Sequence, residues 1–400
     1  MIWWLIIDSK QELNSTFNIF ILSGIYIHIP FCKQACSYCD FYFVTRQKLL
    51  DPFVEALVKE IRFYQNSKFV QEPVQTIYIG GGTPSLLNEN QLGQIFSAIH
   101  DVFLLDLKEV TMELNPDDVT ASYLKMIRRF GVHRASMGVQ SFQEEILNFM
   151  HRAHNKTEAL HALEALQATG FPSFTADLIY GNPGQSLSML EQDIRQLLEF
   201  DPPHISAYSL TVEPKTRLGK QVELGRIEPP KDDTLAEHSD LIYNLLEDAG
   251  IHQYEVSNYA KPGKKAVHNS SYWNHKNYLG LGPAAHSFWR DENTAKRWKN
   301  RPDIKHYLEN DPAEYSDERE NLDRQTLAEE RLMLGLRTVE GVSLQEMKQQ
   351  YGFKLSDRQL AFISGQSERG TMELNNHQLK MTREGLKISD LLLVDLLSRG

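Results

Sequence analysis

Short apolar runs alternate with amphipathic segments from residue 24 to about residue 210. Near-continuous apolar runs of this length are typical of parallel strands that are buried on both faces. The segments between them carry apolar residues at helical spacing, as at Phe53, Leu57 and Ile61, where Asp51-Pro52 marks a helix start. The predicted strands are residues 24–29, 76–79, 110–114, 135–139, 174–179 and 205–210.

This strand-then-helix repeat predicts the fold class. Consecutive βα units place their strands in one parallel sheet with right-handed crossovers. Six units predict an α/β fold built on a partial (β/α)6 barrel instead of a closed eightfold barrel, and functional loops then follow the carboxyl ends of the strands. A helix at 235–249 and a strand at 251–256 are expected to extend this barrel.

The second half of the chain is less regular. Residues 257–298 have too little periodicity for an assignment. From residue 324 the pattern predicts helices and a small hairpin, which are typical of an α+β winged-helix-like module; the helices are 327–336, 344–351 and 384–397, and the strands lie near Leu374 and at 379–381. We therefore divide the chain into an N-terminal extension (1–23), a core barrel (24–256), a connecting region (257–323) and a C-terminal winged-helix-like domain (324–400).

The amino-acid composition limits the kinds of binding partner and the cellular compartment that we expect. The 400 residues contain 42 Lys and Arg against 53 Asp and Glu, a net charge of -11, which disfavours nonspecific binding to nucleic acid or anionic membranes. Residues 1–7 are apolar but far shorter than the ~20 residues that span a bilayer, so we expect no stable membrane insertion. Thiols committed to a metal require a reducing compartment, by default the cytoplasm.

All three cysteines, Cys32, Cys36 and Cys39, lie within eight positions. Three thiolates at this spacing can hold three corners of a 4Fe-4S cluster and leave the fourth iron without a protein ligand. Other interpretations compete. A structural zinc site normally closes four ligands, and no second cysteine pair lies nearby. A thioredoxin-like motif needs only two cysteines, and disulfide frameworks are typical of small secreted chains. Motifs farther along the chain favour the cluster.

The spacing CxxxCxxC, entered from Tyr26-Ile-His-Ile-Pro-Phe31, resembles the signature of the radical S-adenosylmethionine superfamily. More narrowly, it resembles the branch that contains oxygen-independent coproporphyrinogen III dehydrogenase and the haem chaperones called HemW. The resemblance implies that the amino and carboxylate groups of S-adenosylmethionine chelate the open iron. It also implies that residues 24–256 form the radical S-adenosylmethionine core barrel.

Polar residues near the ends of the later strands supply further candidates. By themselves, the glycines after residue 79 indicate a turn, and single polar residues are more often solvated. The resemblance assigns Gly81, Gly82 and Thr83 to the methionine moiety of S-adenosylmethionine. It assigns other contacts with this molecule to Glu113, Gln140, Arg152 and Asp177. The predicted set is completed by Tyr26, by the backbone of Tyr38 and, more weakly, by Thr211.

Two features separate the branches of this family. The dehydrogenases carry a fourth cysteine where this chain has Phe41, and the difference favours the haem chaperones. The second feature is the segment His268-Asn-Ser-Ser-Tyr-Trp273, which matches their HNxxYW motif. A lone histidine is more often a hydrogen-bonded core or surface residue, but with the motif intact we predict that His268 ligates haem iron while Tyr272 and Trp273 pack against the porphyrin. The next candidates for the axial ligand are His275 and His286.

The leading hypothesis is a haem chaperone. Such a protein binds a 4Fe-4S cluster, S-adenosylmethionine and haem, meets an electron donor protein, and passes haem to an acceptor protein. The alternative is an enzyme, an oxygen-independent coproporphyrinogen III dehydrogenase that oxidatively decarboxylates propionate side chains in porphyrin biosynthesis. A DNA-binding regulator is a third hypothesis, suggested by the winged-helix-like domain; the acidic composition disfavours it, and we expect no nucleic-acid partner.

Overall fold

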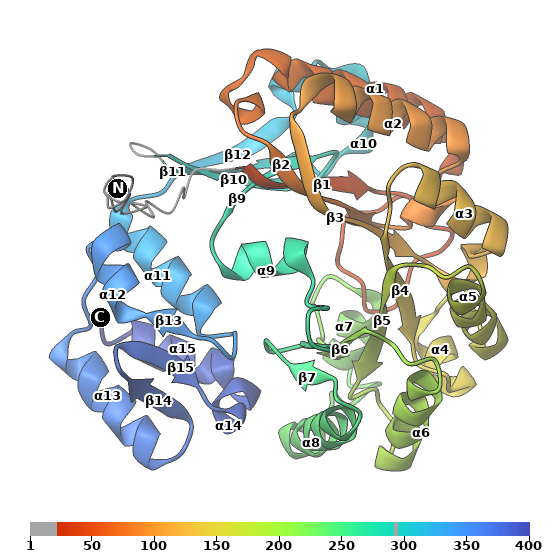
Figure 1. The fold of residues 1–400 in the computed structure, drawn as a ribbon. Coiled ribbons are helices and arrows are strands. Elements are labelled where there is room, and N and C mark those ends of the chain that lie inside the picture. Colours follow the sequence, from red (N-terminus) through yellow and green to blue (C-terminus); the bar gives the residue numbers. More distant parts are fainter. Residues whose placement is uncertain (1–21, 292–294) are drawn as a thin grey trace, which may run out of the picture.

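The centre of the molecule is a sheet of twelve strands. In this computed structural model, which describes residues 22–291 and 295–400, the strands run in the order β12-β11-β10-β9-β1-β2-β3-β4-β5-β6-β8-β7 (Figure 1). The first six strands of the chain are parallel neighbours, so the predicted partial (β/α)6 barrel is confirmed. These strands are β1 (Leu22–Ile29), β2 (Val74–Gly81), β3 (Leu105–Leu114), β4 (Arg134–Gln140), β5 (Ser173–Tyr180) and β6 (His204–Ser209).

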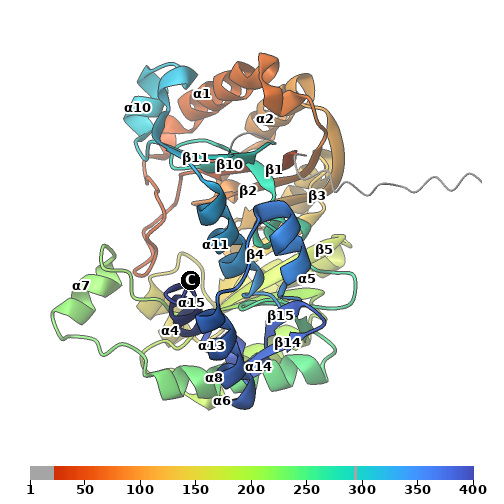
Figure 2. The same cartoon turned by 90° about the vertical axis from the view of Figure 1, so that its left-hand side faces the viewer.

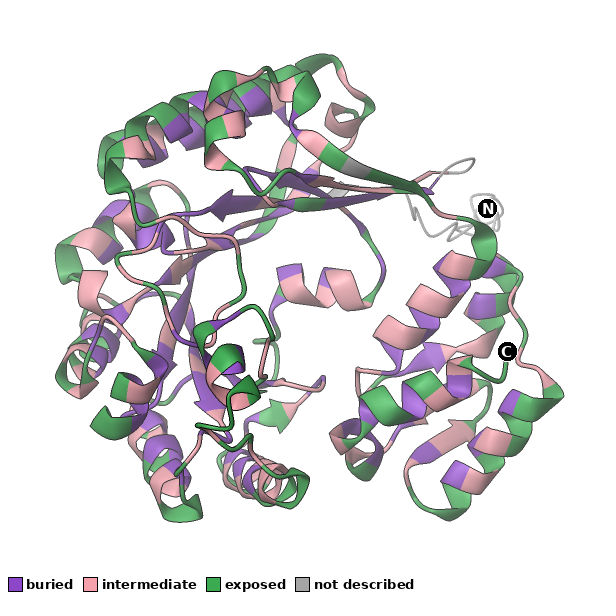
Figure 3. Cartoon of the chain, turned by 180° about the vertical axis from the view of Figure 1, so that it is seen from behind, coloured by how far each residue is buried: buried purple, intermediate pink, exposed green. Residues whose placement is uncertain are grey.

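Helices cover the outer face of this sheet, with buried positions on their sheet-facing sides (Figure 3). The first buries Phe53, Leu57 and Ile61, as their spacing predicts. Capping boxes at Asn88 and Asn155 begin the second and fifth helices, because each Asn side chain accepts a hydrogen bond from a backbone N–H of the first turn. The barrel helices are α1 (Leu50–Phe63), α2 (Glu89–Val102), α3 (Ala121–Arg129), α4 (Glu144–Met150), α5 (Lys156–Ala168), α6 (Leu187–Leu198), α7 (Arg217–Glu223) and α8 (Asp232–Asp248).

Residues 252–321 extend the same sheet at both ends. The strand predicted at 251–256 is only the two-residue β7 (His252–Gln253), which pairs with β8 (Asn258–Ala260) beyond β6. At the other end β9 (Asn277–Leu281) lies parallel to β1, and three antiparallel strands follow. The remaining elements here are α9 (Val267–Trp273), β10 (His286–Arg290), β11 (Ala295–Asn300), α10 (Ile304–Glu309) and β12 (Ser316–Asn321).

The C-terminal part has its own three-stranded antiparallel sheet, as expected for a winged-helix-like domain, and its core also includes Phe288 and Ala295 of the large sheet. The predicted helix 384–397 is interrupted at Ile388 and forms two helices, and α13 was not predicted. The elements are α11 (Arg324–Gly335), β13 (Val342–Ser343), α12 (Leu344–Glu346) with the π-helical turn η7 (Met347–Tyr351), α13 (Asp357–Glu368), β14 (Met372–Asn375), β15 (Gln378–Met381), α14 (Arg383–Lys387) and α15 (Ser389–Leu397).

Ion pairs hold this domain against the barrel. Arg383 and Lys387 of α14 both pair with Asp240 of α8, and the two views show α14 beside α8 (Figures 1 and 2). The division into four parts stays a prediction, and residues 1–21 of the predicted extension lie outside the described residues. Among the helices that the structure describes, none is both long and apolar enough to cross a membrane.

Candidate functional site

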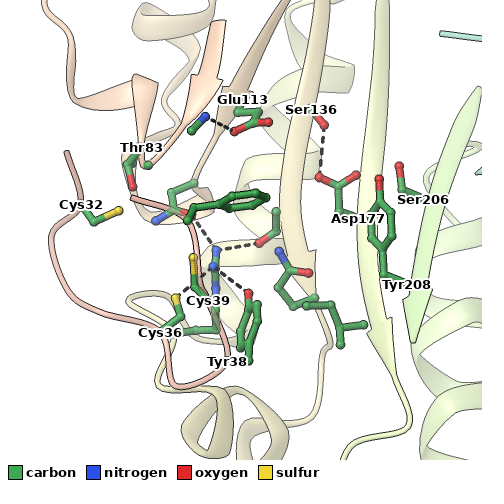
Figure 4. Close-up of a pocket in the computed structure, with 18 of the residues that line it drawn as sticks. Cys32, Cys36, Tyr38, Cys39, Thr83, Glu113, Ser136, Asp177, Ser206 and Tyr208 are labelled. Carbon is green, nitrogen blue, oxygen red and sulfur yellow. Dashed lines mark hydrogen bonds between the residues drawn. The ribbon is translucent and has the colours of Figure 1, made fainter. Parts of the chain in front are cut away.

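A cavity of about 520 Å³, the first cavity, opens at the carboxyl ends of the parallel strands (Figure 4). Figure 4 shows the three cysteines on one side of it and Asp177, Ser206 and Tyr208 on the other. The structure brings together twelve of the residues predicted from the sequence: Cys32, Cys36, Tyr38, Cys39, Gly81, Gly82, Thr83, Glu113, Gln140, Arg152, Asp177 and Thr211.

The cysteines lie on the cluster loop, residues 30–46, which follows β1. Backbone hydrogen bonds close this loop at its base, where the N–H of Cys32 donates to the carbonyl oxygen of Val44 at 3.0 Å. The loop is also fixed at its tip, because the Ser37 hydroxyl donates to the carbonyl oxygen of Phe149 at 3.0 Å. All three thiols are free and partly exposed toward the cavity.

The thiols need an electropositive partner to become thiolates. Burial raises the pKa of Cys32, although a hydrogen bond from Thr83 opposes the rise, and burial raises the pKa of Cys39 to about 11. Bound iron supplies that positive charge. In the part of the chain that the structure describes, no three His, Cys, Asp or Glu side chains converge as they would around a single ion. A cubane needs a wider spread, since each thiolate binds a different iron atom.

Arg152 connects the cluster loop to the barrel. Its Nη1 donates to the sulfur of Cys36 and to the Tyr38 hydroxyl, both at 3.4 Å. Its Nη2 donates to Asn115 Oδ1 at 2.6 Å and to the carbonyl oxygen of Gly138 at 3.1 Å. The remaining donor, Nε, is buried and has no hydrogen-bond partner among the described residues. A ligand with an acceptor group would satisfy it.

Glu113 presents a partly buried carboxylate at the end of β3. Its Oε1 accepts from the Tyr78 hydroxyl at 2.8 Å and its Oε2 from the backbone N–H of Gly81 at 3.0 Å. Burial raises the pKa of this carboxyl to about 7, against the lowering effect of those two hydrogen bonds. A cationic ligand group in the first cavity would favour the ionised form.

Asp177 forms a second carboxylate site, on β5. Its Oδ2 accepts from the Ser136 hydroxyl at 3.1 Å, and Ser206 hydrogen-bonds the same carboxyl from β6. Burial raises the pKa of Asp177 to about 6. Side chains from three neighbouring strands thus gather acceptors and hydroxyls at one point, an arrangement that suits a ligand with several hydroxyl groups.

Gln140, at the end of β4, has an unusual backbone conformation and lines the first cavity. Its φ of 68° lies in the left-handed region, which is uncommon for a residue other than glycine. Its buried Oε1 has no hydrogen-bond partner among the residues described. A strained backbone and an unpaired buried acceptor at the same residue both indicate a binding role.

The glycines after β2 allow close packing against the cluster loop. A Cβ on Gly82 would lie 2.6 Å from the carbonyl oxygen of Phe31, and one on Gly81, whose φ is 111°, would meet the ring of His28 at 2.6 Å. Only glycine therefore lets this turn approach the start of the cluster loop.

The predicted haem contacts and Tyr26 do not line the first cavity. Tyr26 stacks on Tyr78, with ring centroids 6.0 Å apart, and so supports the tyrosine that binds Glu113. His268 is buried in α9, where its Nδ1 lies 2.8 Å from Thr76 Oγ1 and its Nε2 lies 2.8 Å from the Tyr272 hydroxyl. Burial lowers the pKa of His268 to about 3. Ligation of iron by His268 would require one of these hydrogen bonds to open.

Sequence reasoning missed several polar residues that line the first cavity. Tyr78, Ser136 and Ser206 lie within predicted strands, and Asn115 follows one directly. The available signal was the alternation of side chains along a strand. Every second residue points to the same face, so Thr76, Tyr78 and Gly80 share one face of β2.

Comparison with known proteins identifies the family. Residues 26–197 match the model of the radical SAM superfamily, and residues 322–388 match that of the HemN C-terminal domain. The heme chaperone HemW of Bacillus subtilis (strain 168) is 36% identical over 371 residues, which are 91% of this chain and 96% of that relative. The chain belongs to the HemW family. Its membership in the radical SAM superfamily implies a 4Fe-4S cluster and S-adenosylmethionine as cofactors.

Further relatives agree with the HemW assignment, which confirms the resemblance inferred from the motifs. The heme chaperone HemW of Escherichia coli (strain K12) is 40% identical over 267 residues, or 66% of this chain and 69% of that one. The solved structure of coproporphyrinogen III oxidase (HemN) from Escherichia coli has a TM-score of 0.81 at 21% identity, covering 94% of this chain and 90% of its own. This second similarity shows a shared fold.

Proposed function

We propose that this HemW-family protein is a haem chaperone that binds a 4Fe-4S cluster, S-adenosylmethionine and haem, and passes haem to an acceptor protein. The observation that carries the proposal is that three free cysteines share one cavity with polar side chains from five parallel strands. The relatives named heme chaperone support the haem part. An electron donor protein is the second partner, and the cytoplasm is the proposed location.

Cys32, Cys36 and Cys39 are the proposed cluster ligands. When bound, the cluster supplies an iron atom without a protein ligand and a redox centre. Arg152 then holds Cys36 in place and adds positive charge beside its sulfur, and Thr83 forms a hydrogen bond with Cys32. Close packing of Gly82 against Phe31 holds the three cysteines of the cluster loop beside the end of β2.

The other residues of the first cavity are the proposed contacts of S-adenosylmethionine. Glu113 suits the amino group of this cationic ligand, because a carboxylate accepts hydrogen bonds from the N–H groups of an amine that iron binds. Asp177 with Ser136 suits the ribose hydroxyls. Gln140 Oε1 and Arg152 Nε are unpaired groups that a ligand would satisfy. The backbone of Gly81 and Gly82 with Thr83 would face the methionine moiety, next to the backbone of Tyr38, and Tyr26 acts through Tyr78.

Haem titration tests the proposal. Protein reconstituted with iron and sulfide under anaerobic conditions is titrated with haem and then mixed with an apo-haemoprotein. We expect saturable haem binding and transfer of haem to the apo-haemoprotein. Cluster-loaded protein that binds no haem contradicts the proposal, and so does formation of protoporphyrinogen from coproporphyrinogen with added S-adenosylmethionine and reductant. Cys36→Ser, which removes one cluster ligand, is the control that separates cluster loss from haem loss.

A further inference from the structure

A second cavity of about 880 Å³ lies beside the first. Its walls are the cluster loop, β9 to β11 and α11, elements that converge around α9 in Figure 1. Asp40, Phe41 and Phe43 line both cavities, so the segment after the last cysteine separates them. The volume lies within the range of about 300–1,000 Å³ that is typical of sites for small molecules and cofactors.

One face of the sheet supplies the polar wall of the second cavity. In the antiparallel register His286 lies opposite Lys299, and Phe288 lies opposite Arg297. Alternate residues of a strand share a face, so all four side chains point to the same side, and all four line the cavity. Tyr278 lies opposite Phe288 on the next strand and extends this face.

The charge of the second cavity is the reverse of that of the whole chain. Among its lining residues, the basic ones outnumber the acidic ones by four to two, although the net charge of the protein is -11. Two of the six charges cancel, because Arg297 pairs with Glu330 at 2.8 Å. The surplus favours a ligand that carries carboxylates. The charged residues are Lys215, Lys276, Arg297, Lys299, Asp40 and Glu330.

The apolar part of the wall suits a flat ligand. Phe41 is 66% exposed, which is unusual for a large aromatic side chain, and it faces a cavity that Tyr272, Tyr278 and Phe288 also line. Tyr272 and Tyr278 meet edge to face, with ring centroids 4.7 Å apart. Aromatic walls of this kind bind planar ring systems by stacking and edge contacts.

Three histidines line the second cavity, and they differ in their surroundings. His28 is buried, with its Nδ1 3.1 Å from the Tyr26 hydroxyl and its Nε2 2.9 Å from the carbonyl oxygen of Tyr42. His275 is also buried, and its Nε2 lies 3.3 Å from a carboxylate oxygen of Glu330. His286 is exposed, on the same face as Lys299. Of the three, His286 is therefore the one that a metal-containing ligand can reach without unpacking the core.

We propose that haem occupies the second cavity, with its iron bound by His286 and its propionates paired with Lys299 and Lys276. This proposal rests on the proposed haem-chaperone function and gives it a site apart from His268. The porphyrin covers Phe41, Tyr272 and Phe288, and the iron-sulfur cavity lies on the other side of residues 40–43. The protein thereby holds haem and S-adenosylmethionine at the same time, in adjacent sites.

Haem titration of anaerobic, cluster-loaded variants tests this site. We expect His286→Ala to weaken haem binding by about tenfold or more and to change the haem absorption spectrum. Added imidazole should restore the spectrum, because it enters the space left by the side chain. Binding of S-adenosylmethionine should be unchanged, which also shows that the variant is folded. His252→Ala, an exposed histidine at the far edge of the sheet, is the matched control and should behave as the wild type.

The outcomes separate this site from the function on which it rests. Wild-type protein that binds no haem contradicts the haem-chaperone function and removes the basis of this proposal. If the wild type binds haem and His286→Ala binds it equally well, the second-cavity site alone is overturned. The same conclusion follows if imidazole restores the haem spectrum of His268→Ala and not that of His286→Ala. Lys299→Glu should weaken binding of haem by about tenfold and leave binding of its dimethyl ester unaltered. Equal effects on haem and the ester overturn the propionate assignment.

Discussion

Glu113→Gln is expected to weaken binding of S-adenosylmethionine and to remove most of its pH dependence. Glutamine keeps the shape of the side chain and can still accept a hydrogen bond from Tyr78 or Gly81, but it loses the negative charge. Hydrogen bonds to charged groups contribute about 1.5–3 kcal/mol, so the dissociation constant should rise by roughly 10- to 150-fold at pH 8.

The pH dependence follows from the carboxyl of Glu113 itself. Its pKa is about 7 because burial raises it from its ordinary value of 4.5. The carboxylate that prefers a cationic ligand is therefore the minor form at pH 6 and the major form at pH 8. If only that form binds, the wild type should bind S-adenosylmethionine about tenfold more tightly at pH 8 than at pH 6.

Equilibrium dialysis with labelled S-adenosylmethionine on cluster-loaded protein measures both effects. The comparison of variant and wild type cancels the titration of the ligand's own amino group. Glu60→Gln is a matched control, because burial also raises the pKa of Glu60 to about 7, but this residue does not line the first cavity. A Glu113→Gln protein with wild-type affinity and the wild-type pH profile would refute this account of Glu113.

The remaining predictions concern stability and the cluster. The pKa of Glu60, which accepts hydrogen bonds from Gly282, Asn300 and Tyr307, is raised by burial from 4.5 to about 7. Its contribution to stability is complete below pH 4.5 and is lost as the pH rises through 7. Between pH 6 and pH 8, the free energy of unfolding in urea should fall by about 1 kcal/mol more in the wild type than in Glu60→Gln. Parallel pH profiles of the two proteins would contradict this role of Glu60. Gly82→Ala should reduce the iron and sulfide retained after reconstitution, because its Cβ collides with the backbone of the cluster loop; wild-type content would contradict the packing argument. Arg152→Met should lose iron faster under chelation and unfold with about 1–3 kcal/mol less stability, since Asn115 and Gly138 lose a buried donor; an unaltered variant would exclude that role.

The barrel could be predicted from the sequence because its strands are buried on both faces. A mostly apolar run such as 174–179 is typical of a parallel strand that is covered by helices, because both faces of such a strand are buried. Strands β10 and β11 escaped detection because one face packs on the core while the other carries His286, Arg297 and Lys299. Their sequences mix aromatic and basic residues without a clean alternation. The seven-residue α4 and α7 are too short to show helical periodicity.

The residues of the first cavity could be predicted where a short sequence motif contains them. Cysteine spacing and a glycine triplet are local signals, whereas a serine such as Ser136 within an apolar strand gives no sign of its carboxylate partner. One partner of His268 was equally hidden, because Thr76 lies far away along the chain and meets it only through the sheet. The motif therefore contained His268 and its partner Tyr272 but not the partner on β2.

The place of β1 in the sheet has a consequence for biosynthesis. This first strand pairs with β2 on one edge, but its other edge pairs with β9, in a register that matches Ile25 with Leu279. A nascent chain emerging from the ribosome can assemble β1 to β6 while that second edge still has open N–H and C=O groups. The edge is closed only after more than half of the polypeptide has been translated. We therefore expect the ribosome-bound intermediate to depend on general folding factors and to aggregate when synthesis stalls between residues 210 and 277.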